Sequence, residues 1–266
     1  MSINAIEQMA THLGPIAPEI NRVDLAACVV AETPDLVALN KPGWLVCHPS
    51  KNGPRSSLVG AAREDFALEQ VHLVSRLDRE TSGLVVLARH RSAARRLQMA
   101  LQSGWVEKRY WAILVGEMQE ARVEVSQALE PDPESPVAAK VRVAADGGQK
   151  AQSTFKRLAC AGGFTLAEVR PHTGRKHQIR AHAAWLGYPV AGDKIYGPDA
   201  RHFLTFIAAG WTPDLAAALP HPRQLLHAAR LSFPGETPDA PDLTLHAPAP
   251  ADWVAFSASV GLPVPG

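Results

Sequence analysis

The segment VSRLDRETSGLVVLARH, residues 74–90, places a charged cluster directly before a fully apolar strand. The cluster consists of Arg76, Asp78, Arg79 and Glu80. The Thr-Ser-Gly run at 81–83 predicts a tight turn, and the β-branched run after it predicts a strand over 84–90. A rigid sheet can position Asp78 at the start of such a strand, so this carboxylate is a candidate functional group. A plainer role stays open, in which Asp78 caps a turn and Arg76 makes a surface ion pair.

The N-terminal side of this segment predicts further strands and a helix. The apolar runs 26–31 and 36–40 favour strands. Pro42-Gly43 suits the two central positions of a type II turn, which predicts a hairpin from 36–40 into 44–49. Residues 56–67 have helical spacing behind a serine N-cap.

The C-terminal side mixes strands and helices. Residues 92–104 predict a helix that begins at Ser92 and ends at Gly104. The other expected elements are an alternating strand at 108–116, short strands from about 120 to 171, a helix at 177–187, a loop-rich elaboration at 198–222 and a strand at 225–233. Strands that come in runs, rather than as regular βαβ units, predict an α+β fold: a mixed, mainly antiparallel sheet with flanking helices and loops.

The composition is that of a folded protein of ordinary size. The chain has 266 residues, 46% of them hydrophobic and 20% charged, which excludes disorder and fibrous structure. We expect one domain over 26–257, between a leader at 1–25 and a tail at 258–266. No apolar run reaches the roughly 18 residues that cross a bilayer, and no secretory signal is visible. The sequence therefore predicts a cytoplasmic protein with no membrane partner.

Cysteine and histidine spacing does not favour a metal site. The cysteines are Cys28, Cys47 and Cys160, which form no CxxC pair and are expected to be core thiols. Zinc binding by His172, His177 and His182 is disfavoured, because steps of five residues do not align on one helix face.

The charge is uneven along the chain although the net charge is only +1. Residues 41–231 carry 26 basic and 17 acidic residues, which gives +9, whereas 1–40 and 232–266 are each at −4. A basic middle favours a nucleic-acid partner, because phosphate neutralisation supplies most of the non-specific affinity. A solvated surface without a polyanion partner stays possible on charge alone.

Two basic clusters accompany the Asp78 segment. Residues 171–182, PHTGRKHQIRAH, place Arg175, Lys176, His177 and Arg180 at the entry of a helix, where free N–H groups attract phosphate or carboxylate. Tyr110 follows Lys108 and Arg109 and comes after a helix that carries Arg91, Arg95 and Arg96. Aromatic and basic side chains in this pattern suit base stacking with phosphate contacts, although a solvated helix start and a half-buried core tyrosine are the plainer alternatives.

Five motifs in this order resemble the RluA-type family of RNA pseudouridine synthases. The motifs are LVALNKPGWLVCHP (36–49), RLDRETSGLVVLA (76–88), KRYWAILVG (108–116), GRKHQIRAHAAWLGYPVAGDKIYG (174–197) and LLHAARLSF (225–233). The resemblance covers roughly residues 30 to 235. It implies the fold of that family and an isomerase activity.

The resemblance also implies roles for individual residues. Asp78 corresponds to the essential catalytic carboxylate. Arg76 matches the arginine that helps to hold RNA with the target uridine flipped out, Tyr110 the aromatic that stacks on this base, and Arg180 the arginine that pairs with the aspartate. A guanidinium suits that last role, because it is always charged and can bond a carboxylate in a bidentate manner. Further RNA contacts are expected from Arg79, Lys108, Arg109, Arg175, Lys176 and His177.

The implied reaction converts a uridine within RNA into pseudouridine. The bond from the sugar to nitrogen breaks, the base rotates, and a carbon–carbon bond forms. No redox or group transfer occurs, so no cofactor and no metal are expected. Attack of Asp78 on the sugar, attack on the pyrimidine ring and abstraction of a sugar proton all stay open. Flipping the base costs a few kcal/mol, which contacts to the flipped nucleotide offset.

Two departures from the family pattern affect substrate fit. Ser75 stands where the family usually has histidine, and Trp44 stands where glycine is common. The N-terminal 25 residues are too few for the S4-like domain of many relatives, so we expect structured RNA as partner, with tRNA favoured and 23S rRNA close behind, and a monomer. A non-catalytic RNA-binding protein is the alternative. A hydrolase with Asp78 as nucleophile is more remote, because it needs a second carboxylate as acid and the nearby Glu80 points elsewhere if the loop is extended.

Overall fold

The computed structural model describes residues 17–48, 52–66, 70–235 and 241–265. The described chain divides into two compact units. The Asp78 unit consists of Ala17–Lys108 and His227–Pro248, and the Arg180 unit contains Arg109–Leu226 and the C-terminal segment from Ala249. Most of the expected leader, residues 1–16, lies outside the described residues. No helix in the described part of the chain has the length and apolar character of a membrane span.

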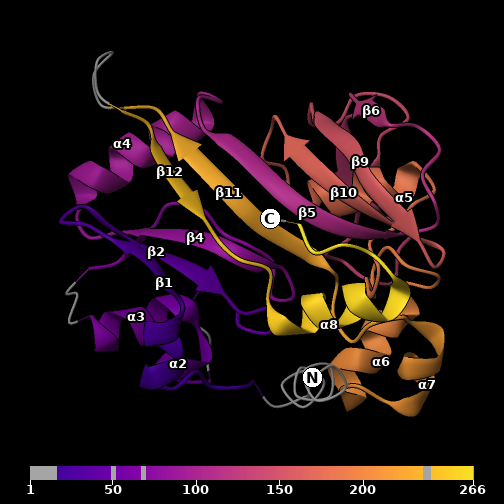
Figure 1. Cartoon of the computed structure of the whole chain (residues 1–266), viewed down its shortest axis with the longest axis horizontal. Coiled ribbons are helices and arrows are strands. Elements are labelled where there is room, and N and C mark those ends of the chain that lie inside the picture. Colours follow the sequence, from indigo (N-terminus) through magenta and orange to yellow (C-terminus); the bar gives the residue numbers. More distant parts are fainter. Residues whose placement is uncertain (1–16, 49–51, 67–69, 236–240, 266) are drawn as a thin grey trace. The chain divides into compact units, whose positions relative to one another are not determined.

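The Asp78 unit is a mixed, mainly antiparallel set of strands with helices around it (Figure 1). Its strands are β1 (Val29–Glu32), β2 (Leu36–Lys41), β3 (His72–Leu73), β4 (Ser82–Ala88), β11 (Leu226–Phe233, from His227 on) and β12 (Leu243–His246). The order is β1-β2-β4-β11, with β3 paired to β4 and β12 to β11; only the pairing of β4 with β11 is parallel. The helices are α2 (Arg22–Ala27), η1 (Pro54–Ser56), α3 (Leu58–Asp65) and α4 (Arg91–Gln102). Every residue of β4 is buried, as its continuous apolar run predicts.

Local signals predict most elements of this unit correctly, with exceptions at their ends. The predicted turn at 81–83 and strand at 84–90 are shifted, because Ser82 and Gly83 already belong to β4, which ends at Ala88. Residues 26–31 are only partly a strand, because Ala26 and Ala27 belong to α2. The helix predicted to begin at Ser92 is capped two residues earlier by His90, whose side chain accepts a hydrogen bond from Ala93 N and also contacts Asp35. Gly104 ends this helix at φ +74°, as predicted.

The type II hairpin predicted at Pro42-Gly43 is wrong. Gly43 does not have the positive φ that this turn requires at its third residue. The turn lies one residue later, where Leu45 N donates to Pro42 O at 3.5 Å. No strand follows among the described residues 44–48, and Val46 makes a single parallel bridge to Ser57. Trp44 also keeps a negative φ, so the absence of glycine at this position does not strain the turn.

The Arg180 unit contains a second antiparallel set of strands (Figure 1). Its order is β5 (Glu107–Val115, from Arg109 on), β10 (Phe164–Pro171), β9 (Ser153–Ala161) and β6 (Arg122–Val125), and β7 (Leu129–Pro131) and β8 (Val141–Val143) form a separate pair. The helices are α5 (Gln178–Trp185), α6 (Arg201–Ala209), α7 (Pro213–Ala218) and α8 (Ala251–Val260). Both units together have the α+β composition that the sequence predicts.

The alternation of β5 divides the core of this unit as expected. Ala112 and Leu114 lie in one buried cluster, against which Tyr110 packs, and Ile113 lies in another cluster with Trp253.

Two other expectations about this unit and the cysteines are wrong. Residues 198–222 hold α6 and α7 rather than mainly loops. Of the three cysteines only Cys47 is fully buried, while Cys28 is half-buried and Cys160 is exposed.

A buried charged cluster makes the stability of this unit depend on pH. His221, Arg223 and Asp252 are all at most 3% exposed, and Arg223 Nε donates to Asp252 Oδ2 at 2.5 Å. Burial lowers the pKa of His221 to about 4, although Asp252 Oδ2 lies 3.7 Å from its Nε2. The folded chain thus keeps His221 neutral in a range of pH where the unfolded chain binds a proton.

We expect the free energy of unfolding to fall as the pH drops from about 6.5 to 4. At pH 5 the proton bound only by the unfolded chain lowers it by about 2 kcal/mol relative to pH 7. Urea unfolding of the wild type and of His221→Gln at these two pH values measures this difference. A variant that loses as much stability at pH 5 as the wild type would rule out His221 as the responsible group.

Candidate active site

The Asp78 loop joins β3 to β4 and begins the apolar strand that positions it. Asp78 is half-buried, and its carbonyl accepts a hydrogen bond from Thr81 N at 3.2 Å, which closes the turn. Gly83, with φ +108°, is required next, because a Cβ atom there would lie 2.3 Å from Ala228 O on β11. Ser82, the first residue of β4, is fixed by a 2.9 Å hydrogen bond to the buried His227 of β11. The loop therefore enters the sheet at a defined point.

Lys41 ties the Asp78 loop to the turn after β2. Its side chain is fully buried, and Nζ donates to Arg79 O at 2.9 Å, to Leu45 O at 2.8 Å and to Pro42 O at 2.8 Å. A buried ammonium is stable only when its donors are satisfied, and here all three are. The peptide next to Asp78 is consequently held by a charge-assisted hydrogen bond.

Two further contacts join the same two segments. Arg79 Nε donates to Trp44 O at 3.1 Å, and Leu77 N donates to Cys47 Sγ at 3.4 Å. Burial lowers the pKa of the Arg79 guanidinium. Arg79, which the sequence predicts as an RNA contact, thus has a structural contact within its own unit. We call Lys41, Trp44, Cys47 and their partners at 77–79 the loop brace.

Replacing Lys41 with methionine tests the loop brace. The change keeps an unbranched side chain that is one atom shorter and removes the three donated hydrogen bonds. We expect the free energy of unfolding to fall by about 2 kcal/mol, because buried carbonyl groups lose their partners. Urea unfolding measures the effect, with Lys156→Met, at an exposed position of β9, as the control. Equal stability of the two variants would show that Lys41 does not brace the loop.

Arg180 on α5 is held by a buried carboxylate that the sequence analysis missed. Its guanidinium donates from Nε to Asp193 Oδ2 at 2.6 Å and from Nη2 to Asp193 Oδ1 at 2.8 Å. Asp193 is fully buried and also accepts hydrogen bonds from the backbone N–H groups of Ile195 and Tyr196. Burial alone would raise the pKa of Asp193, but the charge of Arg180 and these hydrogen bonds hold it below its usual range. The pair fixes the plane of the guanidinium.

Tyr196 and His177 complete the surroundings of Arg180. The guanidinium carbon lies 5.1 Å from the centre of the Tyr196 ring, within cation–π distance. The Tyr196 hydroxyl accepts a hydrogen bond from Val141 N at 3.0 Å and lies 3.2 Å from His177 Nδ1. His177 precedes α5 with φ 52°, and it is the only described residue other than glycine with a positive φ. A non-glycine residue in this conformation is a common mark of a functional position.

The remaining predicted site residues are distributed over both units. Tyr110 is half-buried on β5 and packs against the core cluster that contains Ile179, the neighbour of Arg180. Arg109 contacts Glu168 at 3.5 Å, and burial lowers the pKa of Lys108. Arg76, Arg175 and Lys176 are exposed. Because Asp78 and Arg180 belong to different units, their expected pairing stays a prediction.

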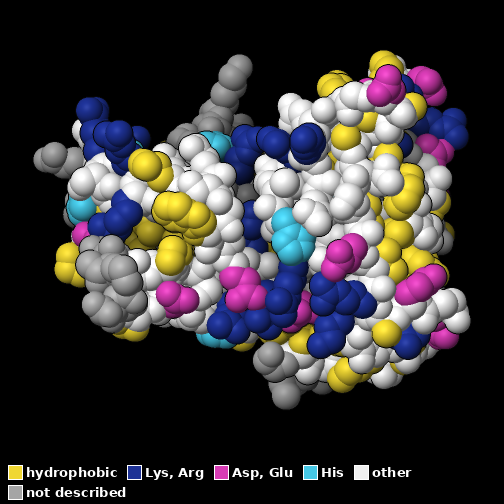
Figure 2. Space-filling view, turned by 90° about the horizontal axis from the view of Figure 1, so that it is seen from above, with side chains coloured by type: hydrophobic (Ala, Val, Ile, Leu, Met, Phe, Trp, Pro, Cys, Tyr) yellow, Lys and Arg dark blue, Asp and Glu magenta, His cyan; other side chains and the backbone are white. Residues whose placement is uncertain are grey.

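Lysine and arginine side chains gather in several groups on the face shown in Figure 2. This distribution agrees with the basic middle of the sequence.

The described residues contain no group of three or more His, Cys, Asp or Glu side chains suited to a metal ion. Asp193 and Lys41 could have been suspected from the sequence, since each is a charged residue next to an apolar run within a quoted motif, GDKIYG and NKP.

Known proteins are similar to this chain in sequence and in fold. Residues 35–185 match the family model described as RNA pseudouridylate synthase. The chain is 37% identical over 200 residues to an uncharacterized RNA pseudouridine synthase of Chloroflexus aurantiacus, and this match covers 73% of the chain and 57% of that protein. It is 31% identical over 240 residues to ribosomal large subunit pseudouridine synthase D of Vibrio vulnificus, with 88% and 70% covered. The chain thus spans little more than half the length of the Chloroflexus relative.

A solved structure extends the likeness to three dimensions. Human RNA pseudouridylate synthase domain containing 1 matches with a TM-score of 0.66 and 25% identity, covering 88% of this chain and 86% of that one. The matched family region contains the Asp78 loop, β5 and α5 through Trp185. On these grounds the chain belongs to the RNA pseudouridylate synthase family, as its ordered motifs predict.

Proposed function

We propose that this protein is an RNA pseudouridine synthase that isomerises a uridine within structured RNA and uses Asp78 as its catalytic carboxylate. The observation that carries the proposal is the loop brace: a fully buried lysine and two further hydrogen bonds hold Leu77 and Arg79, the residues on either side of Asp78. A catalytic group needs such fixed positioning, whereas an ordinary surface turn does not require a buried charged residue to hold it. Family membership gives the reaction class.

The other residues have supporting roles in this proposal. Tyr110 stacks on the flipped base, because an aromatic face binds any base by stacking. Arg180, with its plane fixed by Asp193, carries a permanent charge that keeps the catalytic carboxylate ionised. Arg76, Arg79, Lys108, Arg109, Arg175, Lys176 and His177 contribute contacts to the RNA. Neither a cofactor nor a metal takes part in the reaction.

Two RNA classes are the candidate substrates. We propose tRNA as the first of the two. Several relatives are named as ribosomal large subunit pseudouridine synthases, which supports 23S rRNA. Because both are structured RNAs with exposed loops, the proposal covers both, and the first experiment separates them. We propose further that the protein acts in the cytoplasm as a monomer.

The test is release of tritium from carbon 5 of uridine. Purified protein is incubated with total tRNA or with ribosomal RNA that carries the label. Carbon 5 loses its hydrogen when it becomes the glycosidic carbon, so release by the wild type alone, and not by Asp78→Asn, supports the isomerase and identifies the RNA class. No release from either RNA, with binding intact, would favour a non-catalytic RNA-binding protein.

A further inference from the structure

Helix α4 in the Asp78 unit carries a polar stripe along its outer face. Arg91, Arg95, Gln98 and Gln102 recur at the spacing i, i+4, i+7 and i+11, so their side chains lie along one side of the helix. The residues at 93, 97 and 100, which face away from the stripe, are buried, and the buried Ala94 lies beside the stripe. These four residues, together with His72 of β3, are called the α4 stripe below.

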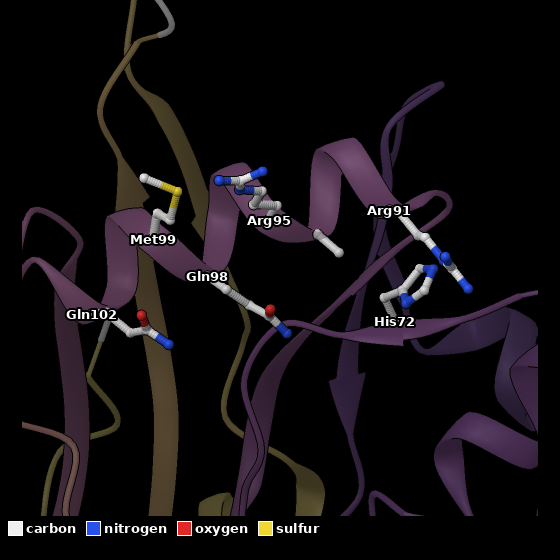
Figure 3. Close-up of a pocket in the computed structure, with 7 residues that line it drawn as sticks. His72, Arg91, Arg95, Gln98, Met99 and Gln102 are labelled. Atoms are coloured by element: carbon white, nitrogen blue, oxygen red, sulfur yellow. The ribbon is translucent and has the colours of Figure 1, made fainter.

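The α4 stripe borders a hollow of about 320 Å³. Figure 3 shows His72 beside Arg91 at one end of this hollow, Gln98 near its middle and Gln102 at the other end. Gln98 Nε2 donates to Leu73 O at 3.1 Å, so its amide nitrogen is held by β3 and its carbonyl oxygen is left as an acceptor. The buried Nε2 atom of His72 has no hydrogen-bond partner among the described residues.

The arginine charges of helix α4 are only partly balanced by acidic residues of the same unit. The helix has three arginines and no acidic residue. Arg96 is paired with Asp35 at 2.6 Å, whereas Arg91 and Arg95 make no ion pair within the described residues. Like charges one turn apart destabilise a helix by about 0.2–0.5 kcal/mol, and the first turn, where Arg91 lies, favours negative charge over positive. An anion between the two arginines would remove this repulsion.

We propose that the α4 stripe binds the phosphate backbone of the RNA substrate at a distance from the target uridine; this inference rests on the proposed function. Guanidinium groups match phosphate oxygens in a bidentate manner. The free amide donors of Gln102 suit phosphate, and the carbonyl oxygen of Gln98 suits a ribose 2′-hydroxyl. Phosphate contacts of this kind set the position of the RNA without reading its sequence.

The register of β4 gives the distance between the two contacts. His72 pairs with Ala88 at the end of β4, and Asp78 lies in the loop before Ser82 at its beginning. Six residues of strand separate the two ends, which corresponds to about 20 Å. Stacked nucleotides of an A-form RNA stem rise about 3 Å each, so the His72 end of the α4 stripe would meet the backbone about seven nucleotides from the flipped base. The substrate is therefore a structured RNA whose stem extends beyond the target loop.

The experiment compares Arg91→Gln/Arg95→Gln with Arg122→Gln/Arg201→Gln. The control removes the same two charges from exposed arginines that each pair with a neighbouring acid, Glu124 and Asp199. Both variants are measured on the RNA class that the wild type isomerises. We expect the α4 variant to raise Kd and KM about tenfold, with kcat at saturating RNA unchanged. The slope of log affinity against log salt should fall by about 1.5, because each lost phosphate contact contributes about 0.7–0.9.

A second arm shortens the RNA so that its stem ends less than about 20 Å from the target uridine. On this RNA the α4 variant and the wild type should bind equally. If the wild type isomerises the full RNA and the α4 variant keeps its Kd and salt slope, the α4 stripe is not an RNA contact, and a protein partner becomes the better explanation. If the wild type neither binds nor isomerises RNA, the proposed function itself fails, and this inference fails with it.

Discussion

The Asp78→Asn variant is expected to lose at least about 10³-fold in turnover while it binds RNA within about tenfold of the wild type. The substitution keeps the size of the side chain and removes its negative charge. Loss of a group that acts directly on the reacting atoms lowers turnover by such factors. Affinity changes little, because removal of one anion does not weaken the attraction to a polyanion. Tritium release and filter binding on the same RNA give the two numbers.

Glu80→Gln is the matched control for this result. Glu80 is a half-buried carboxylate two residues further along the same loop. The variant should keep turnover within a few-fold of the wild type. Equal loss in both variants would point to disturbance of the whole loop and would contradict a special role of Asp78. Release of free uracil by the wild type would instead indicate a hydrolase.

The Asp193→Ala variant should show the largest loss of stability. It leaves the guanidinium of Arg180 buried without its bidentate partner and removes the acceptor for two backbone N–H groups. Breaking a buried ion pair in this way costs about 3–5 kcal/mol. Urea unfolding measures the change. Glu124→Ala, which breaks the exposed pair with Arg122, should cost less than about 1 kcal/mol.

A double variant separates the structural role of this pair from the role proposed for Arg180 in the reaction. Replacing both charges, as in Arg180→Met/Asp193→Leu, removes the uncompensated buried charge, so the double variant should be more stable than Asp193→Ala alone. Its turnover should nevertheless stay low, because Arg180 is missing. Recovery of turnover together with stability would show that Arg180 serves the fold only.

The sequence predicts elements well where a local signal determines them. The apolar run of β4 and the Ser57-capped helix α3 follow from composition and capping alone. The cap of α4 does not, because a serine at position 92 has the better intrinsic preference. His90 caps the helix instead, and its ring is oriented by Asp35, 55 residues earlier in the chain.

The candidate site divides in the same way. Ordered motifs are sufficient to select Asp78, Tyr110 and Arg180 as candidates. The partners that fix their backbone or side chains come from distant positions: Lys41 bonds a carbonyl 38 residues away, and Asp193 lies one loop after α5. Such pairings depend on which strands become neighbours, and a single sequence does not specify that. For this reason the sequence marks Lys41 and Asp193 only as charged residues next to apolar runs and does not predict their partners.

The loop brace also has a consequence for how the protein can change over generations. Because Lys41 bonds both the turn at 42–45 and the peptide beside Asp78, the two segments shift together. A replacement in the turn would therefore shift the backbone around Asp78, the proposed catalytic residue, even if the replaced side chain touches no substrate. Helix α4 makes none of the hydrogen bonds of the loop brace. If α4 contacts RNA as proposed, substitutions on its outer face can change the preference for different RNAs without moving Asp78.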